Sequence, residues 1–286
     1  MEEERTALAM RERTLGPDHP LVADAHQNLG SMFYMQGRYV EAEQEARATL
    51  ALRERALGPD HPDLAQSYNS LANALNGQRR DAEAEVQHQK ALALLVAKFG
   101  PDHPMVGTSR NNFASVLMNR GEYARAEEET RAAMAIRERG LGPDHPEVGQ
   151  SHFNLGLVLA AEGKLEEAEA EQRRGLAIRE KALGPRHVDV ARSLAGLGDV
   201  LRKRKRPADA VEVLERAWSI LEGVGAPAEK RASAAFDLAQ ALWEAGRDRE
   251  RARSLAETAR QLYAEAGARE SKTVQRIDAW LREHVR

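Results

Sequence analysis

Leu15-Gly-Pro-Asp-His-Pro20 is a six-residue stretch that returns along the chain at a fixed interval. It recurs as Leu57 to Pro62, Phe99 to Pro104 and Leu141 to Pro146, and in altered form as Leu183 to Val188. The first residues of these copies, numbered 15, 57, 99, 141 and 183, are 42 positions apart, without insertion or deletion. A period of about 20 to 50 residues is typical of stacked supersecondary units. The interval therefore predicts a repeat protein that works through the surface of its stacked units.

The same stretch predicts where helices end and begin. Gly16 fits the end of a helix, because glycine reaches the left-handed conformation of a C-terminal cap at little cost. Pro17 prevents the helix from continuing, and Pro20 suits the first position of the next helix, where its missing N–H is not needed. We expect Asp18 or His19 to cap that next helix.

Each period contains two helical patterns separated by a glycine. After Pro20, apolar residues recur at helical spacing until Gly37, and a second helix follows until Gly58. The apolar positions are Ala25, Leu29, Met32 and Phe33 in the first helix and Ala42, Ala46, Leu50 and Leu52 in the second. Glu43 and Arg47 lie four positions apart and are predicted to pair on the exposed face of the second helix.

Later periods keep small residues beside large apolar ones. The position of Gly30 is occupied by Ala72, Ala114, Gly156 and Gly198, and that of Ala42 by Ala84, Ala126, Ala168 and Ala210. Small residues let packed helices approach to about 8–10 Å. Together with the glycine turns, this pattern resembles the tetratricopeptide repeat. The length of 42 residues and the Gly-Pro-Asp-His-Pro connection resemble its longer variant, found in kinesin light chains and in many bacterial proteins.

The resemblance covers nearly the whole chain and implies an all-α, right-handed superhelical solenoid of about 14 helices. We expect one repeat array over residues 1–286. Its predicted parts are a half repeat over 2–16, repeats over 17–58, 59–100, 101–142, 143–184 and 185–226, a divergent sixth repeat over 227–268, and a capping helix over 269–286. The capping helix carries Val274, Ile277, Trp280 and Leu281 on one face, as expected of an element that shields the last repeat.

The C-terminal tail has a second resemblance. The stretches Ala234-Ala-Phe-Asp-Leu-Ala and Asp278-Ala-Trp-Leu-Arg are similar to the C-terminal end of large bacterial serine/threonine kinases that carry such arrays. This likeness covers roughly the last 60 residues. The glycine loop, the His-Arg-Asp motif and the Asp-Phe-Gly motif of a kinase are absent from the sequence.

Composition excludes several classes of protein. Hydrophobic residues make up 42% of the chain but aromatic residues only 5%, and this alanine- and leucine-rich mixture suits close-packed helices. The absence of cysteine excludes disulfides and thiolate metal sites. The start of the chain, Met-Glu-Glu-Glu-Arg, lacks the apolar core of a secretion signal, and no apolar run approaches the roughly 20 residues that span a bilayer. We therefore expect a cytoplasmic protein without membrane contact, whose net charge of -3 indicates no polyionic partner.

Histidines and carboxylates are the candidates for chemistry. Five histidines recur with the repeat, namely His19, His61, His103, His145 and His187. Repeats stack roughly 10 Å apart, whereas zinc lies about 2.0–2.1 Å from its nitrogen ligands, so we interpret these histidines as connectors or caps. His26, His88 and His152 lie within helices, without a carboxylate or nucleophile at a telling spacing. The acidic strings 41–45, 127–129 and 166–171 fit solvated helix faces. We predict no catalytic site, no bound metal and no cofactor.

Five consecutive cations, Arg202-Lys203-Arg204-Lys205-Arg206, lie at the turn of the fifth unit. Basic runs can bind nucleic acids, anionic membranes or acidic proteins. This run has no interleaved aromatic residue. We interpret it chiefly as a solvated turn, with an acidic protein partner and nucleic acid as open alternatives.

Asparagine is the more informative residue type of the first helices. Asn69, Asn73 and Asn76 form one stripe, although asparagine is a poor helix former. Related positions hold Asn28, Asn111, Asn112 and Asn154. The resemblance implies that first helices line a concave groove in which asparagines hydrogen-bond the backbone of an extended peptide, a task that suits carboxamides. The alternative is that these amides bridge neighbouring repeats.

The fifth unit departs from the asparagine pattern. It offers Arg192, Asp199 and Arg202 instead, so this end of the groove is predicted to recognise charge.

Three classes of function remain open. The first is a non-catalytic scaffold that binds a peptide or partner segment in its groove, as a stand-alone protein or as the C-terminal docking part of a larger signalling kinase. The second, implied by the kinesin-light-chain resemblance, is a cytoskeletal or assembly adaptor. The third is a nucleic-acid-linked regulator that uses the basic run.

The first helix is expected to leave an apolar end uncovered. Ala7, Leu8 and Met10 are predicted to point toward the place of an earlier helix. Exposed apolar surface at the end of a solenoid favours association. We therefore expect upstream sequence or a second copy of the chain to cover it, and predict weak self-association there.

Overall fold

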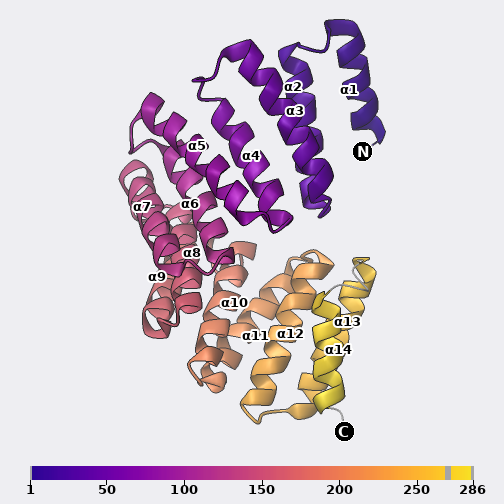
Figure 1. Ribbon diagram of the computed structural model, residues 1–286. Helices are drawn as coiled ribbons and strands as arrows, with labels where there is room; N and C mark the ends of the chain where they lie inside the picture. The colour runs from indigo at the N-terminus through magenta and orange to yellow at the C-terminus, as the bar shows by residue number, and fades with distance from the viewer. Residues whose placement is uncertain (1, 268–271, 285–286) are drawn as a thin grey trace. The chain divides into compact units, whose positions relative to one another are not determined.

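The structure is a computed structural model that describes residues 2–267 and 272–284, with the backbone alone for Glu2 and Glu3. Over these residues the chain forms 14 α-helices and no β-strand (Figure 1). The helices are α1 (Glu2–Leu15), α2 (Pro20–Met35), α3 (Tyr39–Leu57), α4 (Leu64–Gly77), α5 (Asp81–Phe99), α6 (Pro104–Asn119), α7 (Tyr123–Leu141), α8 (Pro146–Glu162), α9 (Leu165–Leu183), α10 (Val188–Lys203), α11 (Pro207–Gly223), α12 (Ala228–Glu244), α13 (Arg249–Glu265) and α14 (Lys272–His284). The predicted all-α fold is confirmed.

The helices fall into two compact units, Met1–Gly140 and Leu141–Arg286. Within the first unit, consecutive helices pack against each other from α1 to α6, and within the second they do so from α8 to α14. First helices of successive pairs also touch, α2 with α4 and α4 with α6 in one unit, α8 with α10 and α10 with α12 in the other. Each unit is therefore a stack of helix pairs in which the first helices lie side by side.

The recurring histidine caps the first helix of four pairs, namely α2, α6, α8 and α10. His19 has an extended backbone (φ -72°, ψ 139°), and its Nδ1 accepts a hydrogen bond from the Leu21 N–H at 3.2 Å. The same bond recurs at His103, His145 and His187, at 3.1–3.3 Å. Satisfying an unpaired N–H of the first turn stabilises the helix. These residues are caps, as predicted, and of the two predicted capping residues His19 fills the role.

The glycine that ends each second helix differs in detail from the prediction. Gly58 has a positive φ of 82°, but its ψ of 164° places it outside the left-handed helical region. Gly100 (φ 82°, ψ 165°) and Gly184 (φ 85°, ψ 155°) repeat this conformation. It is accessible essentially to glycine alone, which explains why the repeat keeps a glycine here.

The two helices of a pair approach most closely where small residues face each other. A β-carbon at Gly175 of α9 would lie 2.7 Å from the backbone oxygen of Gly149 on α8. A β-carbon at Gly198 of α10 would lie 2.6 Å from the Leu214 side chain. At Gly30 of α2 the nearest atom would be the Glu45 β-carbon, at 3.1 Å. The contact between α8 and α9 is thus backbone against backbone and cannot yield by a change of rotamer.

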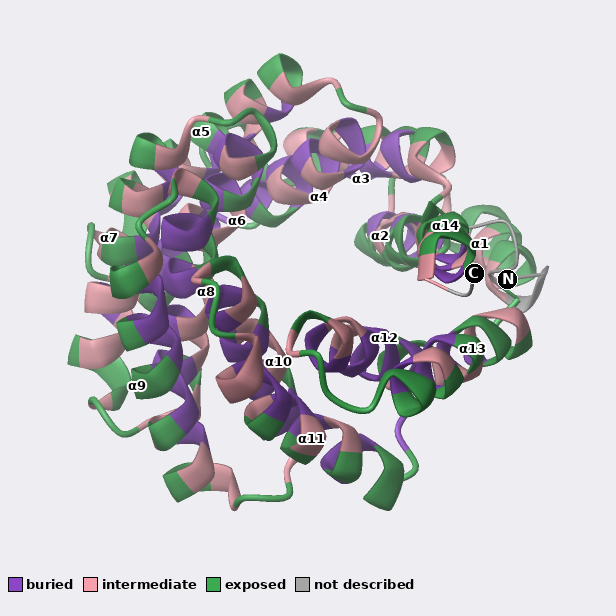
Figure 2. Ribbon diagram, turned by 90° about the horizontal axis from the view of Figure 1, so that it is seen from below, coloured by how far each residue is buried: buried purple, intermediate pink, exposed green. Residues whose placement is uncertain are grey.

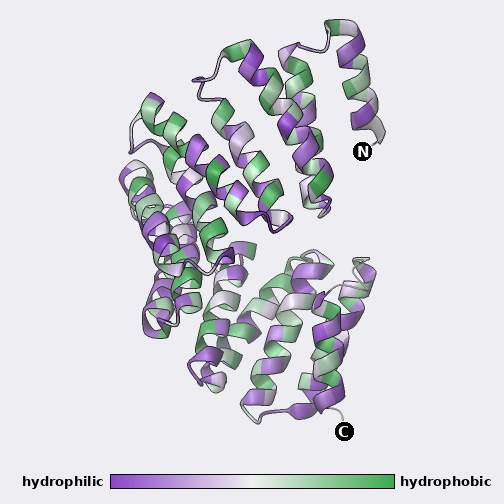
Figure 3. Cartoon of the chain, in the orientation of Figure 1, coloured by the Kyte–Doolittle hydropathy of each residue, from purple (hydrophilic) through white to green (hydrophobic). Residues whose placement is uncertain are grey.

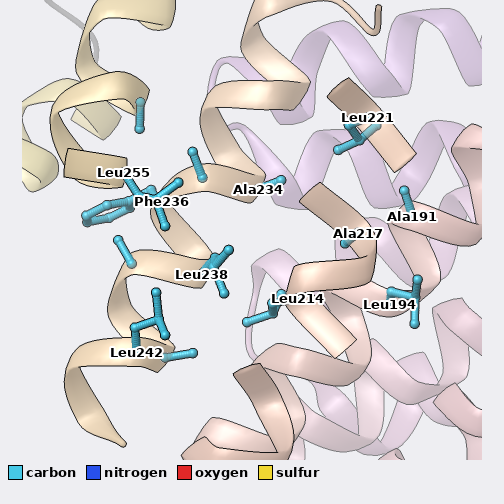
Figure 4. Close-up of a cluster of buried hydrophobic side chains, with 14 of the residues drawn as sticks. Ala191, Leu194, Leu214, Ala217, Leu221, Ala234, Phe236, Leu238, Leu242 and Leu255 are labelled. Atoms are coloured by element: carbon cyan, nitrogen blue, oxygen red, sulfur yellow. The ribbon is translucent and has the colours of Figure 1, made fainter. Parts of the chain in front are cut away.

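The buried residues are mostly the predicted alanines and leucines. Buried residues lie where helices face one another within each unit (Figure 2), and hydrophobic and hydrophilic residues alternate along the helices (Figure 3). In the second unit the core joins α10, α11, α12 and α13, with the alanines interleaved among the leucines (Figure 4). The labelled members of this cluster are Ala191, Leu194, Leu214, Ala217, Leu221, Ala234, Phe236, Leu238, Leu242 and Leu255.

The terminal helices differ in how well they are packed. On α14, Val274, Ile277 and Leu281 are buried, and the Trp280 ring meets Trp243 of α12 edge to face, with ring centres 5.7 Å apart. The prediction for Leu8 of α1 is wrong, since its side chain packs against α2 and α3 rather than toward an earlier helix.

Met10 of α1 is 51% exposed. The uncovered apolar surface at this end is therefore smaller than predicted.

We expect Gly175→Ala to lower the free energy of unfolding by about 1–3 kcal/mol, because the added methyl group has no room against the α8 backbone. This loss should appear although alanine is the better helix former by about 1 kcal/mol. Gly30→Ala is the matched control and should leave the free energy of unfolding unchanged or slightly raised, since Ala72 and Ala114 fill the equivalent position. Urea unfolding of the full chain, followed by circular dichroism, measures both. Equal stability of the two variants would contradict the close contact between α8 and α9.

Candidate functional site

The first helices of the first unit enclose a pocket of about 160 Å³ between α2 and α4. It is lined by Gln27, Gly30, Ser31, Tyr34 and Met35 of α2, Ala42 and Ala46 of α3, and Ser70 and Asn73 of α4. Amides and hydroxyls therefore lie beside aromatic and thioether surface. Such a mixture can take an apolar side chain while hydrogen-bonding the main chain next to it.

Gln27 has an unused acceptor in the wall of this pocket. Its Nε2 donates to the Ser70 Oγ at 2.9 Å, which links α2 to α4. Its Oε1 is buried and has no hydrogen-bond partner among the described residues. A buried polar atom without a partner costs about 1–3 kcal/mol. Because Gln27 lines the pocket, a shift of its side chain would bring this oxygen to an N–H group of a bound segment.

Tyr34 and Met35 form the apolar side of the pocket. Tyr34 meets Tyr39 edge to face with ring centres 5.5 Å apart, and burial, followed by the neighbouring Tyr39, raises the pKa of Tyr34. A β-carbon at Gly77 of α4 would overlap the Tyr39 ring, so this ring is seated on α4. Met35 is 78% exposed. Exposed thioether groups are common at adaptable binding surfaces. The sequence analysis, which relied on the asparagines, did not identify Tyr34 and Met35 as binding residues.

Three of the predicted groove asparagines are engaged inside the protein. The Asn69 Oδ1 accepts a hydrogen bond from the His88 Nδ1 at 2.8 Å, and the Asn76 Oδ1 accepts one from the Asn119 Nδ2 at 3.0 Å. The Asn154 Oδ1 accepts one from the Gln150 Nε2 at 2.6 Å. Asn69 thus ties α4 to α5, and Asn76 ties α4 to α6. Only the Asn76 bond joins neighbouring repeats, as the alternative predicted, because the Asn69 bond lies within one repeat and the Asn154 bond lies within α8.

The other predicted asparagines divide into two groups. Asn111 also has a partner within the chain. Asn28 is exposed, and Asn73 and Asn112 are partly exposed, and none of the three bonds to another described side chain or backbone group. Asn73 lines the pocket between α2 and α4. The candidate contacts for a ligand are therefore Asn28, Asn73 and Asn112.

His88 is a buried structural residue. Burial lowers the pKa of its imidazole to about 4, so the ring is neutral at pH 7. Because Asn69 presents its oxygen, the His88 Nδ1 carries the proton. The Nε2 is buried without a partner in the described parts of the chain. This histidine stiffens the α4–α5 pair.

Some acidic residues of the second helices are buried and form ion pairs between successive repeats, so the predicted solvated face is wrong for Glu43 and Glu169. In contrast, Glu128, Glu166 and Glu167 are exposed as predicted. Glu43 of α3 is only 9% exposed. It accepts hydrogen bonds from Gln78 (2.7 Å) and Arg80 (2.6 Å) beside the next helix pair and from Arg47 (2.7 Å) on its own helix. Burial raises the pKa of Glu43, but these bonds outweigh burial and hold it below its usual value.

The basic run takes part in the same kind of contact in the second unit. Arg204 pairs with Glu169 and with Glu166 (2.9 Å), and Arg206 pairs with Glu169 (3.1 Å). Arg202 binds Glu244 at 2.5 Å, and Lys203 binds Asp199 at 2.8 Å.

Lys205 is the one cation of the run without an ion pair to a described residue. Its backbone has a positive φ of 62°. Most cations of the run therefore form ion pairs within the protein.

His26 and His152 have carboxylate partners that sequence spacing did not reveal. The His26 Nδ1 lies 2.5 Å from the Glu45 Oε2, and the His152 Nδ1 lies 2.6 Å from the Glu171 Oε2. Each pair joins the two helices of one repeat. The interpretation of these histidines as isolated is therefore wrong.

The described residues contain no group of three or more side chains suited to hold a metal ion. None of the described helices is both long enough and apolar enough to cross a bilayer.

Arg192, predicted to recognise charge, lies exposed on α10. Its guanidinium stacks over the Phe153 ring at 5.3 Å and lies 3.7 Å from Asp189. Beneath it, the buried Arg179 donates to the Ser193 Oγ at 2.6 Å and to Gln150, so it connects α9 with α8 and α10. Burial, followed by the charge of Arg192, lowers the pKa of Arg179 to about 10.

Sequence reasoning did not single out Arg179. Its partners come from three different helices, and only the folded arrangement brings them together.

The sequence profile of the tetratricopeptide repeat matches residues 5–55, 28–97, 105–181 and 151–223, which together make up more than half of the chain. The protein therefore belongs to the tetratricopeptide repeat family. Proteins of this family are generally non-catalytic scaffolds for interactions between proteins. A comparison with curated proteins gives no significant match at the level of sequence.

Solved structures share this fold. A putative kinesin light chain with nearly identical repeats from Podosopora anserina is 24% identical, with a TM-score of 0.62 over 72% of this chain and 98% of that one. BtubC (BKLC) from P. vanneervenii is 22% identical, with a TM-score of 0.62 over 78% and 87%. A Rap protein complexed with competence and sporulation factor is 14% identical, with a TM-score of 0.62 over 99% and 85%. The resemblance to kinesin-light-chain repeats is confirmed at the level of fold.

We expect Glu169→Gln to lower the free energy of unfolding at pH 7 by about 1–3 kcal/mol, because it weakens charged hydrogen bonds to Arg173, Arg204 and Arg206. Burial raises the pKa of Glu169, but its bonds to these arginines bring it below its usual value. The contribution of this carboxylate is therefore present above the ordinary glutamate pKa and is lost as pH falls through the lowered one. Unfolding of variant and parent at pH 7 and in acid measures the difference. Glu257→Gln, at an exposed glutamate of α13, is the control and should change stability little. If the two variants behave alike at pH 7, the inter-repeat ion pairs are not structural.

Proposed function

We propose that the chain is a non-catalytic protein-interaction scaffold and that the pocket between α2 and α4 binds an extended segment of a partner protein. An apolar side chain of that segment would lie against Tyr34 and Met35. The flanking peptide groups would bond to Gln27 and Asn73.

The unused acceptor of Gln27 supports this proposal most strongly. Within one pocket, a buried oxygen lacks a donor, an amide has no partner in the described structure, and apolar surface is exposed. The buried oxygen without a donor and the exposed apolar surface are unfavourable in an isolated protein, and the partly exposed amide is free to bind a ligand. A peptide main chain with one apolar side chain would satisfy all three. One structural neighbour, the Rap protein, was solved in complex with a factor, so the fold accommodates a bound partner in that protein.

The alternative functions receive less support. Ion pairing of Arg202, Lys203, Arg204 and Arg206 leaves little free positive charge for a nucleic acid, whose binding depends on neutralised phosphates. The likeness to kinesin light chain repeats concerns the fold, and a cytoskeletal role stays a prediction. No comparison adds support to a kinase context, and self-association through α1 likewise stays a prediction.

Selection of a random peptide library on the full chain tests the proposal. We expect the selected peptides to share an apolar residue, and their affinity to fall about ten-fold or more on Asn73→Ala and on Tyr34→Ala, which corresponds to roughly 1.4 kcal/mol each. Fluorescence anisotropy with labelled peptides gives the affinities.

Gln44→Ala, at an exposed amide of α3 outside the pocket, is the matched control and should leave affinity unchanged. Circular dichroism should show that all three variants are folded, since none of these side chains is buried. Peptides that bind the pocket variants as tightly as the parent protein would show that binding takes place elsewhere.

A further inference from the structure

A second pocket, of about 210 Å³, lies on the first helices of the second unit. Its walls are largely aliphatic, formed by Val188, Ala191 and Ala195 of α10, Leu221 of α11 and Ala234 of α12. Its polar residues are Asp189, Arg192, Lys230, Ser233 and Asp237. The three alanines contribute methyl groups to the same pocket that Asp237 lines.

Asp237 has no hydrogen bond or ion pair with any other residue in the described ranges 2–267 and 272–284. Burial raises the pKa of its carboxyl to about 6. The charges that act on it are Arg202 and Asp199 of α10 and Arg276 of α14, and its own charge raises the pKa of Tyr263 of α13. Both arginines lower the pKa and Asp199 raises it, so burial is the dominant influence.

The neighbours that could neutralise Asp237 are engaged elsewhere. Arg202 donates to both carboxylate oxygens of Glu244, at 2.5 and 3.0 Å, and to Gln240 at 3.0 Å. The guanidinium of Arg276 lies over the Phe236 ring at 5.9 Å. Ser233 bonds to Tyr263. Among the described residues the carboxylate thus feels the charge of both arginines but forms no ion pair with either of them.

A partly desolvated carboxylate without an ion pair is unfavourable for folding. Groups of this kind occur where a ligand supplies the missing interaction. The surroundings indicate the shape of such a ligand, because a pocket lined by alanines accepts a chain of methylene groups and the carboxylate that lines it accepts a cation. Lysine and arginine combine these two parts in one side chain.

We propose that this pocket binds the side chain of a lysine or arginine in a partner segment, with its cationic group against Asp237. The methylene stem lies along Ala191, Ala195 and Ala234. Arg192 and Lys230 at the rim would by themselves favour an anion. Arg192 is already held by Asp189 and Phe153, however, and an anion inside the pocket would face the carboxylate of Asp237. This site lies in the second unit and does not depend on the pocket between α2 and α4.

The test uses three small probes on the ¹⁵N-labelled full chain, followed by nuclear magnetic resonance. The probes are N-acetyl-lysine N-methylamide, its norleucine analogue, in which a methyl group replaces the ammonium, and its glutamate analogue. We expect saturable shifts of the amide signals of Ala195, Ala234 and Asp237 with the lysine probe alone. Saturable shifts with norleucine or glutamate instead would overturn the proposal, as would the absence of shifts with lysine.

Asp237→Asn should weaken the lysine probe about ten-fold or more. The variant should fold, and its melting temperature should not fall, because Asp237 is only partly buried and has no ion pair with a described residue. Asp199→Asn, which removes an exposed carboxylate paired with Lys203, is the matched control and should change affinity less than about two-fold. Unchanged lysine binding by Asp237→Asn would refute the assignment.

Binding should also depend on pH. With a pKa of about 6, the Asp237 carboxyl is mostly ionised at pH 7.5 and mostly protonated at pH 5. The affinity for the lysine probe should therefore fall about ten-fold between these pH values, and this fall should be absent in Asp237→Asn. The same fall in both proteins would mean that another group controls binding.

Discussion

The close approach of two helices at small residues is the contact on which the rest of this structure depends. Gly149 and Gly175 bring α8 and α9 together backbone to backbone, and Gly30 and Gly198 perform related tasks against α3 and α11. At such distances the helices can slide or rotate very little, because a protein interior is close-packed. Each pair therefore presents a fixed apolar face to the next pair, and the period of 42 residues keeps these faces in register. A pair cannot bury that face alone, so stacking follows from the contact within the pair.

Ion pairs between repeats determine which charges remain available for partners. Glu43 and Glu169 are buried acceptors for arginines of the following turn, although their sequence surroundings look like a solvated face. The basic run belongs to this network, which is why its charge does not by itself indicate a ligand. Most charged side chains near the turns are paired within the protein. The candidates for binding a partner are therefore the few polar groups that have no partner in the described chain. Gln27 and Asp237 are two of them, and both lie on first helices beside exposed or small apolar residues.

The sequence was sufficient to predict the helix pairs, the turns and the capping histidines, because these depend on local periodicity and on residues within one turn of each other. It could not predict the bond of His26 to Glu45 or of Asn69 to His88, which join residues 19 positions apart on facing helices. The spacing of 19 positions is the same in both pairs, but the residue types at these positions change from repeat to repeat. The sequence therefore shows no recurring motif for these bonds. Asp237 was missed for a related reason. Its importance comes from partners that it lacks, and the absence of a partner is a property of the folded arrangement alone.

The central claim is that the first helices carry the binding surface while the charges of the second helices hold the stack together. Hydrogen–deuterium exchange of the full chain, with and without a library-selected peptide, tests this most directly. We predict that the peptide increases protection most in α2 and α4 and leaves α5 and the part of α3 beyond Ala46 unchanged. Protection centred on α3 and α5, with α2 and α4 unaffected, would contradict the account.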